Sequence, residues 1–320
     1  MERIVLAYSG GLATSVAIPW LADTYGAEVI TVTMDLGQGR ELEEVRDRAL
    51  ATGAIRAHVL DERDVFAREY LVRGLRADTS GGGSAAIAHA LSLPLIAEKL
   101  VQIAGIEKTS IVAHGSTNDA IDVSARALNG AVRVVAPARE WHMDGAGVLD
   151  YAHARNLPLP PDPETYHAVA GQPEPAMVDV AFDRGLPTGI NGVTMSMLDL
   201  LESLGTLAAA HGVGRSRGRD LRDAPAAIVL FIAHEALLTA VSSDEQRRHA
   251  AGHSREFADM VVSGRWFSPA REALDRSVNA ANERVTGIVR VKLFNGGCEI
   301  VEARPSAVVP GHTLTVVKVS

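Results

Sequence analysis

One stretch decides how the N-terminal half of this chain folds: Ala7-Tyr8-Ser9-Gly10-Gly11-Leu12-Ala13-Thr14-Ser15. It joins an apolar run typical of a strand to a run typical of a helix. Two adjacent glycines let the backbone approach an anion closely, three hydroxyls can donate, and the helix start presents unpaired N–H groups. The stretch therefore predicts a phosphate-binding turn, and it is not a P-loop, because no Gly-Lys-Ser/Thr follows. The alternative is a tight strand-to-helix turn in which Thr14 or Ser15 caps the helix.

Outward from this turn, short β-branched runs alternate with helical runs, which predicts a parallel sheet wrapped by helices. Strands are expected at 3–8, 28–34, 57–60, 110–114 and 132–136, and helices at 14–25, 41–52, 64–75, 89–104 and 116–128. The fold class is thus α/β. Ligands of such sheets gather at the carboxyl ends of the strands, so the loops after Tyr8, Met34 and His114 are the expected binding loops.

The C-terminal half has a different composition and pattern. Six prolines between 156 and 175 indicate a linker, so we expect one domain at 1–160 and an α+β domain at 161–320. The expected elements of the second domain are strands 177–182, 287–294, 298–303 and 313–319, helices 196–211 and 226–241, and a helical region over 244–282.

Composition excludes several classes of protein. The 320 residues carry 31 Lys+Arg against 39 Asp+Glu, a net charge of −8, which excludes a basic nucleic-acid-coating protein. Cys298 is the only cysteine, so an intrachain disulfide, a cysteine zinc site and a two-cysteine sulfur relay are excluded, and a small packing role is expected for it. The N-terminus shows no basic leader and the longest apolar run contains Pro, His and Glu, which predicts a cytoplasmic protein without a membrane span.

The turn at 7–15 resembles that of the argininosuccinate synthase family, N-type ATP pyrophosphatases with an adenine nucleotide α-hydrolase-like, Rossmann-like sheet and a C-terminal synthetase-type domain. Matching segments occur in order along most of the chain: Asp35-Leu36-Gly37-Gln38, Leu75-Arg76-Ala77, Pro94-Leu95-Ile96-Ala97-Glu98-Lys99-Leu100, Ala113-His114-Gly115, Arg139-Glu140-Trp141, His211-Gly212-Val213-Gly214-Arg215, Trp266-Phe267-Ser268-Pro269 and Glu283-Arg284-Val285-Thr286-Gly287. Together these segments are far more specific than any one of them.

The resemblance implies an AMP- and pyrophosphate-forming C–N ligase that uses ATP with Mg²⁺ and joins an acceptor to an amine donor such as aspartate. It implies nucleotide contacts from Ala7, Tyr8, Ser9, Gly10, Gly11, Thr14, Ser15, Met34 and Gly115, and catalytic roles for Ser9, Thr14, Ser15 and Asp122. Thr117 and Asp122 would bind the amine donor, and His89 is a further candidate for the substrate pocket. The implied partners are small molecules, with self-association into a homo-oligomer left open and no nucleic acid or membrane partner.

Several positions depart from the family's pattern. Ala13 stands where the family carries an aspartate, and Ile121 and Asp119 replace its asparagine and lysine. In the acceptor site, Gly81, Ala90, Leu93 and Ala125 replace tyrosine, serine and two arginines, and family segments are missing near 162–171 and 215–217. These losses predict an acceptor other than citrulline, another ureido or carbonyl compound, in a specialised pathway. The alternative is a non-catalytic nucleotide-binding relative; a sulfur-transfer enzyme is disfavoured by the single cysteine.

Four weaker sequence features allow a simpler structural interpretation beside the functional one. The glycine-rich 80–84 could form an anion-binding nest or a lid. His89 could face the acceptor or solvent, and His114 could contact nucleotide or be a hydrogen-bonded buried histidine. His249 and His253 have the spacing of a helical metal pair. Gly252 between them and the lack of a third ligand argue against a metal site, and the dense charges at 244–248 indicate a solvated helix face.

Overall fold

The computed structural model describes residues 2–37, 42–77, 89–158, 174–214 and 225–306. The chain divides into two compact units that exchange segments. The first holds 1–63, 93–166 and 263–267, and the second holds 64–92, 167–262 and 268–320. The expected boundary near 160 lies outside the described residues, so the domains 1–160 and 161–320 stay a prediction.

The first unit contains a parallel sheet of five strands in the order β3-β2-β1-β4-β5. The strands are β1 (Arg3–Ala7), β2 (Glu28–Asp35), β3 (Arg56–Asp61), β4 (Ile111–Ala113) and β5 (Arg133–Val135). All five lie where the sequence predicts strands, and the α/β class is confirmed. The strand order reverses between β1 and β4, which makes the gap between their carboxyl ends the expected ligand crevice.

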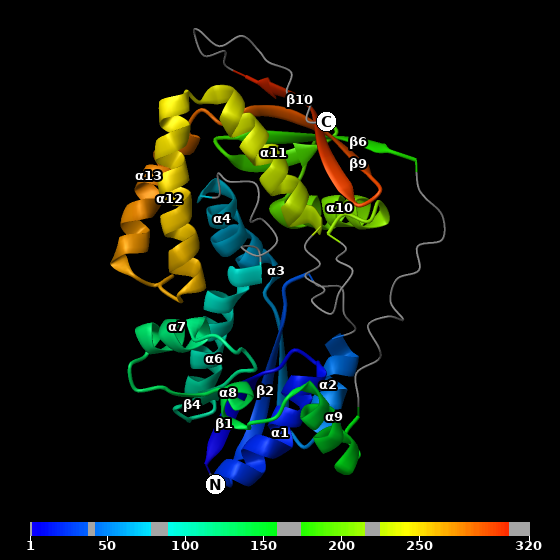
Figure 1. Ribbon diagram of the computed structural model, residues 1–320, viewed down its shortest axis with the longest axis vertical. Helices are drawn as coiled ribbons and strands as arrows, with labels where there is room; N and C mark the ends of the chain where they lie inside the picture. The colour runs from blue at the N-terminus through cyan, green and yellow to red at the C-terminus, as the bar shows by residue number, and fades with distance from the viewer. Residues whose placement is uncertain (1, 38–41, 78–88, 159–173, 215–224, 307–320) are drawn as a thin grey trace. The chain divides into compact units, whose positions relative to one another are not determined.

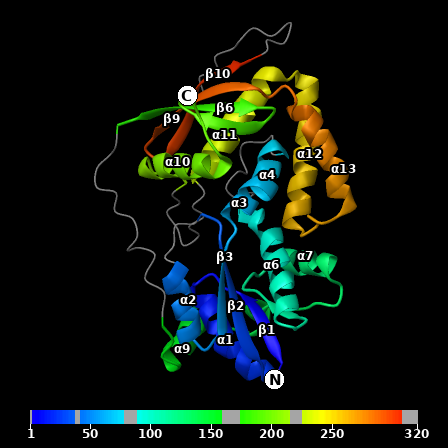
Figure 2. The same cartoon turned by 180° about the vertical axis from the view of Figure 1, so that it is seen from behind.

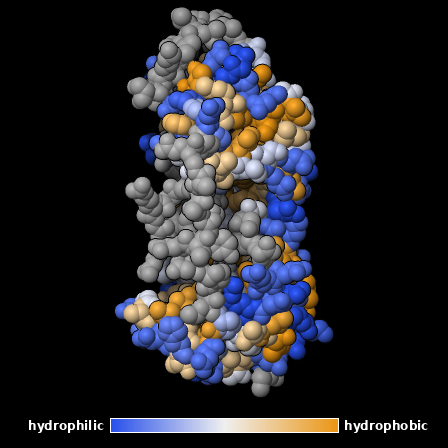
Figure 3. Space-filling model, turned by 90° about the vertical axis from the view of Figure 1, so that its right-hand side faces the viewer, coloured by the Kyte–Doolittle hydropathy of each residue, from blue (hydrophilic) through white to orange (hydrophobic). Residues whose placement is uncertain are grey.

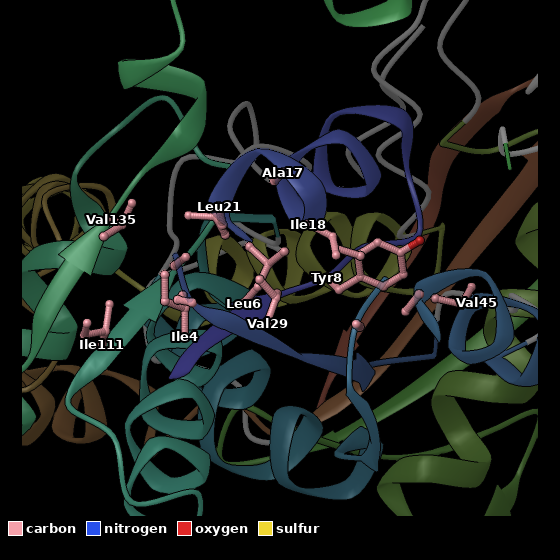
Figure 4. Close-up of a cluster of buried hydrophobic side chains, with 14 residues drawn as sticks. Ile4, Leu6, Tyr8, Ala17, Ile18, Leu21, Val29, Val45, Ile111 and Val135 are labelled. Carbon is pink, nitrogen blue, oxygen red and sulfur yellow. The ribbon is translucent and has the colours of Figure 1, made fainter. Parts of the chain in front are cut away.

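Helices cover both faces of this sheet: α1 (Leu12–Tyr25), α2 (Leu42–Ala51), α6 (Ser92–Ile106), α7 (Ala120–Leu128), α8 (Pro137–Glu140) and α9 (Gly145–Ala154). Alternate residues of β1 point to opposite faces. Ile4 and Leu6 therefore pack in a buried cluster with α1 and α2 (Figure 4), whereas Val5 packs in a second cluster with α6 and α7. Figures 1 and 2 show α2 and α6 on opposite sides of β2.

Two predicted helices differ from the structure. The helix expected at 116–128 begins only at Ala120, because Ser116 and Asn118 bond to nearby backbone N–H groups: Asn118 N donates to Ser116 Oγ (3.3 Å) and Ala120 N to Asn118 Oδ1 (3.2 Å). Such side-chain bonds compete with helix formation. The helix expected at 64–75 is divided into α3 (Arg63–Val65), a π-helical turn (Phe66–Leu71) and α4 (Val72–Ala77).

The second unit contains an antiparallel sheet in the order β10-β9-β6-β7-β8. Its strands are β6 (Ala176–Asp183), β7 (Leu186–Ile190), β8 (Val193–Thr194), β9 (Gly287–Phe294) and β10 (Gly297–Pro305), and its long helices are α10 (Met197–Ala210), α11 (Pro225–Val241), α12 (Asp244–Val262) and α13 (Pro269–Asn282). The expected α+β character is confirmed. β7 and β8 were not predicted, and the strand expected at 313–319 lies outside the described residues.

Local sequence explains the second unit's turns and helix starts. Asn295 and Gly296 both have positive φ, 51° and 83°, as the two-residue hairpin between β9 and β10 requires. Ser196 and Ser268 cap α10 and α13 through their side chains. The apolar α11 is buried on the sheet, and no described helix is long and apolar enough to cross a bilayer. Hydrophilic residues and smaller hydrophobic areas alternate on the face drawn in Figure 3.

Candidate nucleotide site

The turn between β1 and α1 adopts a shape that requires glycine at position 10. Gly10 has a φ of +74°, and a Cβ there would meet Val45 at 3.0 Å. Gly11 is extended (φ −80°, ψ 167°) and precedes the first helical residue, Leu12. Helical geometry leaves the first N–H groups of α1, those of Leu12, Ala13 and Thr14, without carbonyl partners inside the helix. The turn therefore presents a row of donors at the positive end of the helix dipole.

The hydroxyls of the turn stabilise its backbone. Thr14 Oγ1 donates to the Gly11 carbonyl at 3.2 Å and Ser15 Oγ donates to the same carbonyl at 3.0 Å. Ser9 Oγ lies 3.0 Å from Thr14 Oγ1. Since α1 already begins at Leu12 and its N-cap is Gly11, neither Thr14 nor Ser15 is its cap, and the prediction that one of them caps the helix is wrong. Ser9 is exposed, whereas Thr14 and Ser15 are buried, which makes Ser9 the hydroxyl best placed to meet a ligand.

Tyr8 supports the turn from beneath. Its ring is buried between Ile18 of α1 and Val45 of α2 (Figure 4), and its hydroxyl lies 2.9 Å from Ser15 Oγ. Burial raises the pKa of the Tyr8 phenol, so it stays neutral. The Tyr8 carbonyl accepts a hydrogen bond from Thr33 Oγ1 at 3.0 Å. The structure thus gives the Tyr8 side chain a supporting contact, and its predicted nucleotide contact stays a prediction.

Arg48 is a member of this site that sequence reasoning missed. It lies in the last turn of α2 and donates from Nη1 to the Gly10 carbonyl at 2.9 Å. A half-buried guanidinium therefore stands beside the turn and adds positive charge where an anion would lie. The sequence offered no local signal for this contact, because 38 residues separate the two partners.

A second loop, after β4, touches the first. A Cβ built on Gly115 would lie 2.9 Å from Thr14 Cγ2, so only glycine fits here without displacing the turn. Ala7 and Met34 occupy the ends of the neighbouring strands β1 and β2. The predicted nucleotide residues of the first unit thus meet at the carboxyl edge of the sheet, at the point where strand order reverses.

A buried ionic network lies behind this second loop. His114 Nε2 is 2.8 Å from Asp122 Oδ2, and Arg139 Nη2 donates to Asp122 Oδ1 at 2.7 Å. His114 is 1% exposed and Asp122 is 4% exposed. Of the two interpretations of His114, the hydrogen-bonded buried histidine is confirmed. The contact joins the end of β4 to the first turn of α7, and Arg139 comes from α8.

The charges in this network follow from burial and hydrogen bonding. Burial lowers the pKa of His114, and the bond to Asp122 only partly opposes that effect, so the imidazole is neutral near pH 7. Burial alone would raise the pKa of Asp122, but the bonds from Arg139 and His114 outweigh it and lower that pKa below its ordinary value. Asp122 is therefore a carboxylate whose two oxygens both have partners.

The remaining predicted substrate residues, Thr117 and His89, belong to different units. Thr117 is exposed on the turn between β4 and α7, whereas His89 is exposed in the second unit. Ile121, Leu93 and Ala125 are 3%, 7% and 0% exposed and pack in the apolar cluster of α6 and α7. At these three positions, where the sequence departs from the family's polar pattern, the structure therefore contains hydrophobic core. Residue 81 and the segments 80–84, 162–171 and 215–217 lie outside the described residues.

Other candidate groups supply no site. Over the described residues, no group of three or more His, Cys, Asp and Glu side chains could hold a metal ion, and this includes the region of His249 and His253. Burial raises the pKa of the Cys298 thiol to about 12. A thiol with a raised pKa is not activated, which agrees with the packing role expected for Cys298.

Two family models match consecutive parts of the chain. Residues 3–158 match the "Arginosuccinate synthase N-terminal HUP domain" and residues 160–310 match the "Arginosuccinate synthase C-terminal domain". The first match agrees with the five-stranded parallel sheet, because HUP domains are Rossmann-like.

Curated relatives agree along nearly the full chain. Argininosuccinate synthase of Symbiobacterium thermophilum is 35% identical over 92% of this chain and 86% of its own length. The proteins of that name from Oceanobacillus iheyensis and Bacillus subtilis are both 35% identical, and the matches cover 94% and 95% of this chain and 84% and 87% of the relatives. The agreement of both family models and of these relatives shows that the chain belongs to the argininosuccinate synthase family.

Proposed function

We propose that this protein is an ATP-dependent C–N ligase of the argininosuccinate synthase type that forms AMP and pyrophosphate. One observation carries the proposal: the start of α1, with its unpaired N–H groups, lies at the carboxyl edge of the sheet where strand order reverses, with Arg48 and Gly115 beside it. Family membership supports an ATP-dependent ligase.

The residues of the turn fit a polyphosphate. The N–H groups of Leu12 to Thr14 and the Ser9 hydroxyl would hold phosphate oxygens, and Arg48 would balance part of their charge. Mg²⁺, when bound with ATP, would supply charge neutralisation at the phosphates. Ala13 is exposed on the first turn of α1 and offers no carboxylate, so we propose that the metal depends on phosphate and water ligands here.

The proposed reaction has two steps. The acceptor's carbonyl or ureido oxygen attacks the α-phosphorus of ATP, the bond to pyrophosphate breaks, and an adenylated acceptor forms. The amine then attacks the activated carbon, AMP leaves with the electron pair of the C–O bond, and the amine loses a proton. The protein's contribution is alignment and electrostatic stabilisation. We propose aspartate as the amine donor, at the exposed turn of Thr117 and beside Asp122.

Two findings favour different acceptors. The names of the relatives favour citrulline with aspartate. Against this, Leu93 and Ala125 are core residues at positions where the resemblance implies arginines. Each missing charge-assisted hydrogen bond weakens binding by about 1.5–3 kcal/mol. We therefore propose a ureido acceptor, with citrulline as the first compound to test, bound more weakly than in relatives that keep both arginines.

Pyrophosphate exchange tests the proposal. Purified protein is incubated with ATP, Mg²⁺ and labelled pyrophosphate, with citrulline or other ureido and carbonyl compounds, and with and without aspartate. Acceptor-dependent incorporation of label into ATP supports the ligase. Absence of ATP binding by calorimetry would refute the nucleotide site itself. ATP binding without exchange under any acceptor would instead support the non-catalytic relative, which the exposed Ala13 favours.

A further inference from the structure

We propose that His114 is a positioning residue that connects the nucleotide loop at Gly115 with the amine-donor residue Asp122. The inference rests on the proposed function, because it assigns His114 a part in the same reaction. One buried imidazole would fix the backbone after β4 through Nδ1 and hold the Asp122 carboxylate through Nε2.

The hydrogen bonds fix the tautomer of the ring. The backbone N–H of Ser116 donates to His114 Nδ1 at 3.1 Å. Since an N–H group can only donate, Nδ1 must be the unprotonated nitrogen. The proton of the neutral ring is then on Nε2, which donates to Asp122 Oδ2 at 2.8 Å. Each nitrogen thus has one defined partner, in a place with almost no contact with solvent.

The turn between β4 and α7 is held at two points by this network. His114 holds Ser116, and Arg139 Nη1 reaches the carbonyl of Asn118 at 3.4 Å while its Nη2 holds Asp122. Arg126, one turn further along α7, lies 3.8 Å from the same Asp122 oxygen. Thr117, the exposed residue between the two points, is therefore presented to the amine donor from a fixed backbone.

The same network limits what Asp122 can do. Its carboxylate is ionised, buried and bonded on both oxygens, and its lowered pKa makes it a weak base. It therefore acts as a fixed negative charge toward an ammonium group and not as the acceptor of the amine's proton. Asp122 is then an electrostatic and positioning group, which narrows the catalytic role that the resemblance implied.

The link to the nucleotide passes through Gly115. This residue is adjacent to His114, and a Cβ built on it would lie 2.9 Å from Thr14 Cγ2, so the backbone at Gly115 runs close to the phosphate turn. A change in the His114 ring that releases Ser116 would alter the backbone that carries Gly115. The two nitrogens of His114 should therefore influence different ligands.

Two substitutions separate these influences. In His114→Asn the amide oxygen can replace Nδ1 as acceptor for Ser116, but the contact with Asp122 is lost. In His114→Gln the amide nitrogen can replace Nε2 as donor to Asp122, but the contact with Ser116 is lost. We expect His114→Asn to raise the KM for aspartate roughly tenfold with a nearly unchanged ATP affinity, and His114→Gln to weaken ATP affinity roughly tenfold with a nearly unchanged KM for aspartate.

A matched control exists at the opposite edge of the sheet. His58 Nε2 lies 2.8 Å from Glu107, and Arg56 holds the same carboxylate, so His58→Gln perturbs the same kind of network away from the site. We expect it to change neither ATP affinity nor the KM for aspartate. Thermal unfolding of all three variants would show whether they keep the fold.

The outcomes separate this inference from the proposed function. If the wild-type protein neither binds ATP nor catalyses exchange, the proposed function fails. If the wild-type protein is active but both His114 variants change the two ligands equally, or no more than His58→Gln does, the positioning role is refuted. Nitrogen-15 NMR of the His114 ring gives a readout that needs no activity: the Nε2–H tautomer at pH 7 supports the inference, whereas a cationic ring or the Nδ1–H tautomer overturns it.

Discussion

Substituting Gly115 by alanine tests the contact between the two loops of the nucleotide site. The added methyl would stand 2.9 Å from Thr14 Cγ2, whereas carbon atoms pack best at about 3.5–4.0 Å. The loops must therefore separate by roughly 0.6–1.1 Å. Gly115 has an ordinary φ, so alanine introduces this steric contact without backbone strain. Overpacking of this kind costs about 1–3 kcal/mol, and if that cost falls on binding, ATP affinity drops roughly 5- to 150-fold.

Calorimetry with ATP and Mg²⁺ measures this effect, and a second substitution tests its cause. Thr14→Ser removes Cγ2 but keeps the hydroxyl that bonds to the Gly11 carbonyl, so Gly115→Ala combined with Thr14→Ser should regain most of the lost affinity. Gly105→Ala on α6, where a Cβ meets nothing within 4 Å, is the control and should bind ATP as the wild type does. Unchanged affinity in Gly115→Ala, or no recovery in the double variant, would refute the reasoning.

Three further predictions concern the turn, the buried network and the packing of α7. Arg48→Gln should lower ATP affinity by about 1–2 kcal/mol, and calorimetry that finds equal affinity would show that the guanidinium does not act on the phosphates. In the folded protein the pKa of His114 lies below its ordinary 6.5 and that of Asp122 lies below 3.8. As pH falls, the unfolded chain therefore binds more protons than the folded chain, and the folded state loses stability. Both contributions to stability are therefore present at neutral pH. The contribution of His114 is lost below about pH 6.5 and that of Asp122 below about pH 3.8. Urea unfolding at pH 5 and 7.5 should show that the free energy of unfolding changes less with pH in His114→Gln than in the wild type. Gly264→Ala should destabilise the first unit by about 2–4 kcal/mol, because its Cβ would stand 2.3 Å from the Ala120 carbonyl at a φ of +73°; an unchanged melting temperature would contradict this packing.

The sequence predicts those parts of the fold that have local causes. β1, the glycine turn and α1 follow from a β-branched run, two glycines and a helical run within 25 residues, and each lies where expected. The α+β character of the second unit follows in the same way from alternation in β6 and β9 and from the Asn295-Gly296 turn.

Other parts depend on contacts between distant segments. The segment 263–267 joins the first unit although it lies between two helices of the second, and Ser124 of α7 donates to the Gly264 carbonyl across 140 residues. The segment 64–92 joins the second unit although its helical pattern resembles that of its neighbours. No local pattern marks either exchange, because the contacts that decide it join residues far apart in the sequence.

The candidate site shows the same division. The glycine turn could be predicted from its two adjacent glycines between a strand and a helix, and Gly115 from the resemblance to the family. The position of Arg48 and the bonding of Asp122 could not, because each depends on how helices pack on the sheet. Sequence comparison assigned Asp122 to a substrate, yet the structure shows both of its oxygens already bonded to protein.

The bonding of both Asp122 oxygens affects how charge would be stabilised in the proposed reaction. The phosphate turn supplies only backbone N–H groups, hydroxyls and one shared guanidinium, so it can stabilise the negative charge that develops at the α-phosphate without a titrating group. The amine side supplies a carboxylate whose charge Arg139 and His114 hold constant. With neither Asp122 nor a neutral His114 acting as the base, we expect the amine's proton to leave to solvent or to the departing phosphate oxygen. The rate of the condensation should then follow the fraction of free amine in aspartate and rise with pH above neutrality. A rate that instead followed a protein group titrating below the ordinary histidine pKa of 6.5, and lost that dependence in His114→Gln, would show that His114 exchanges the proton after all.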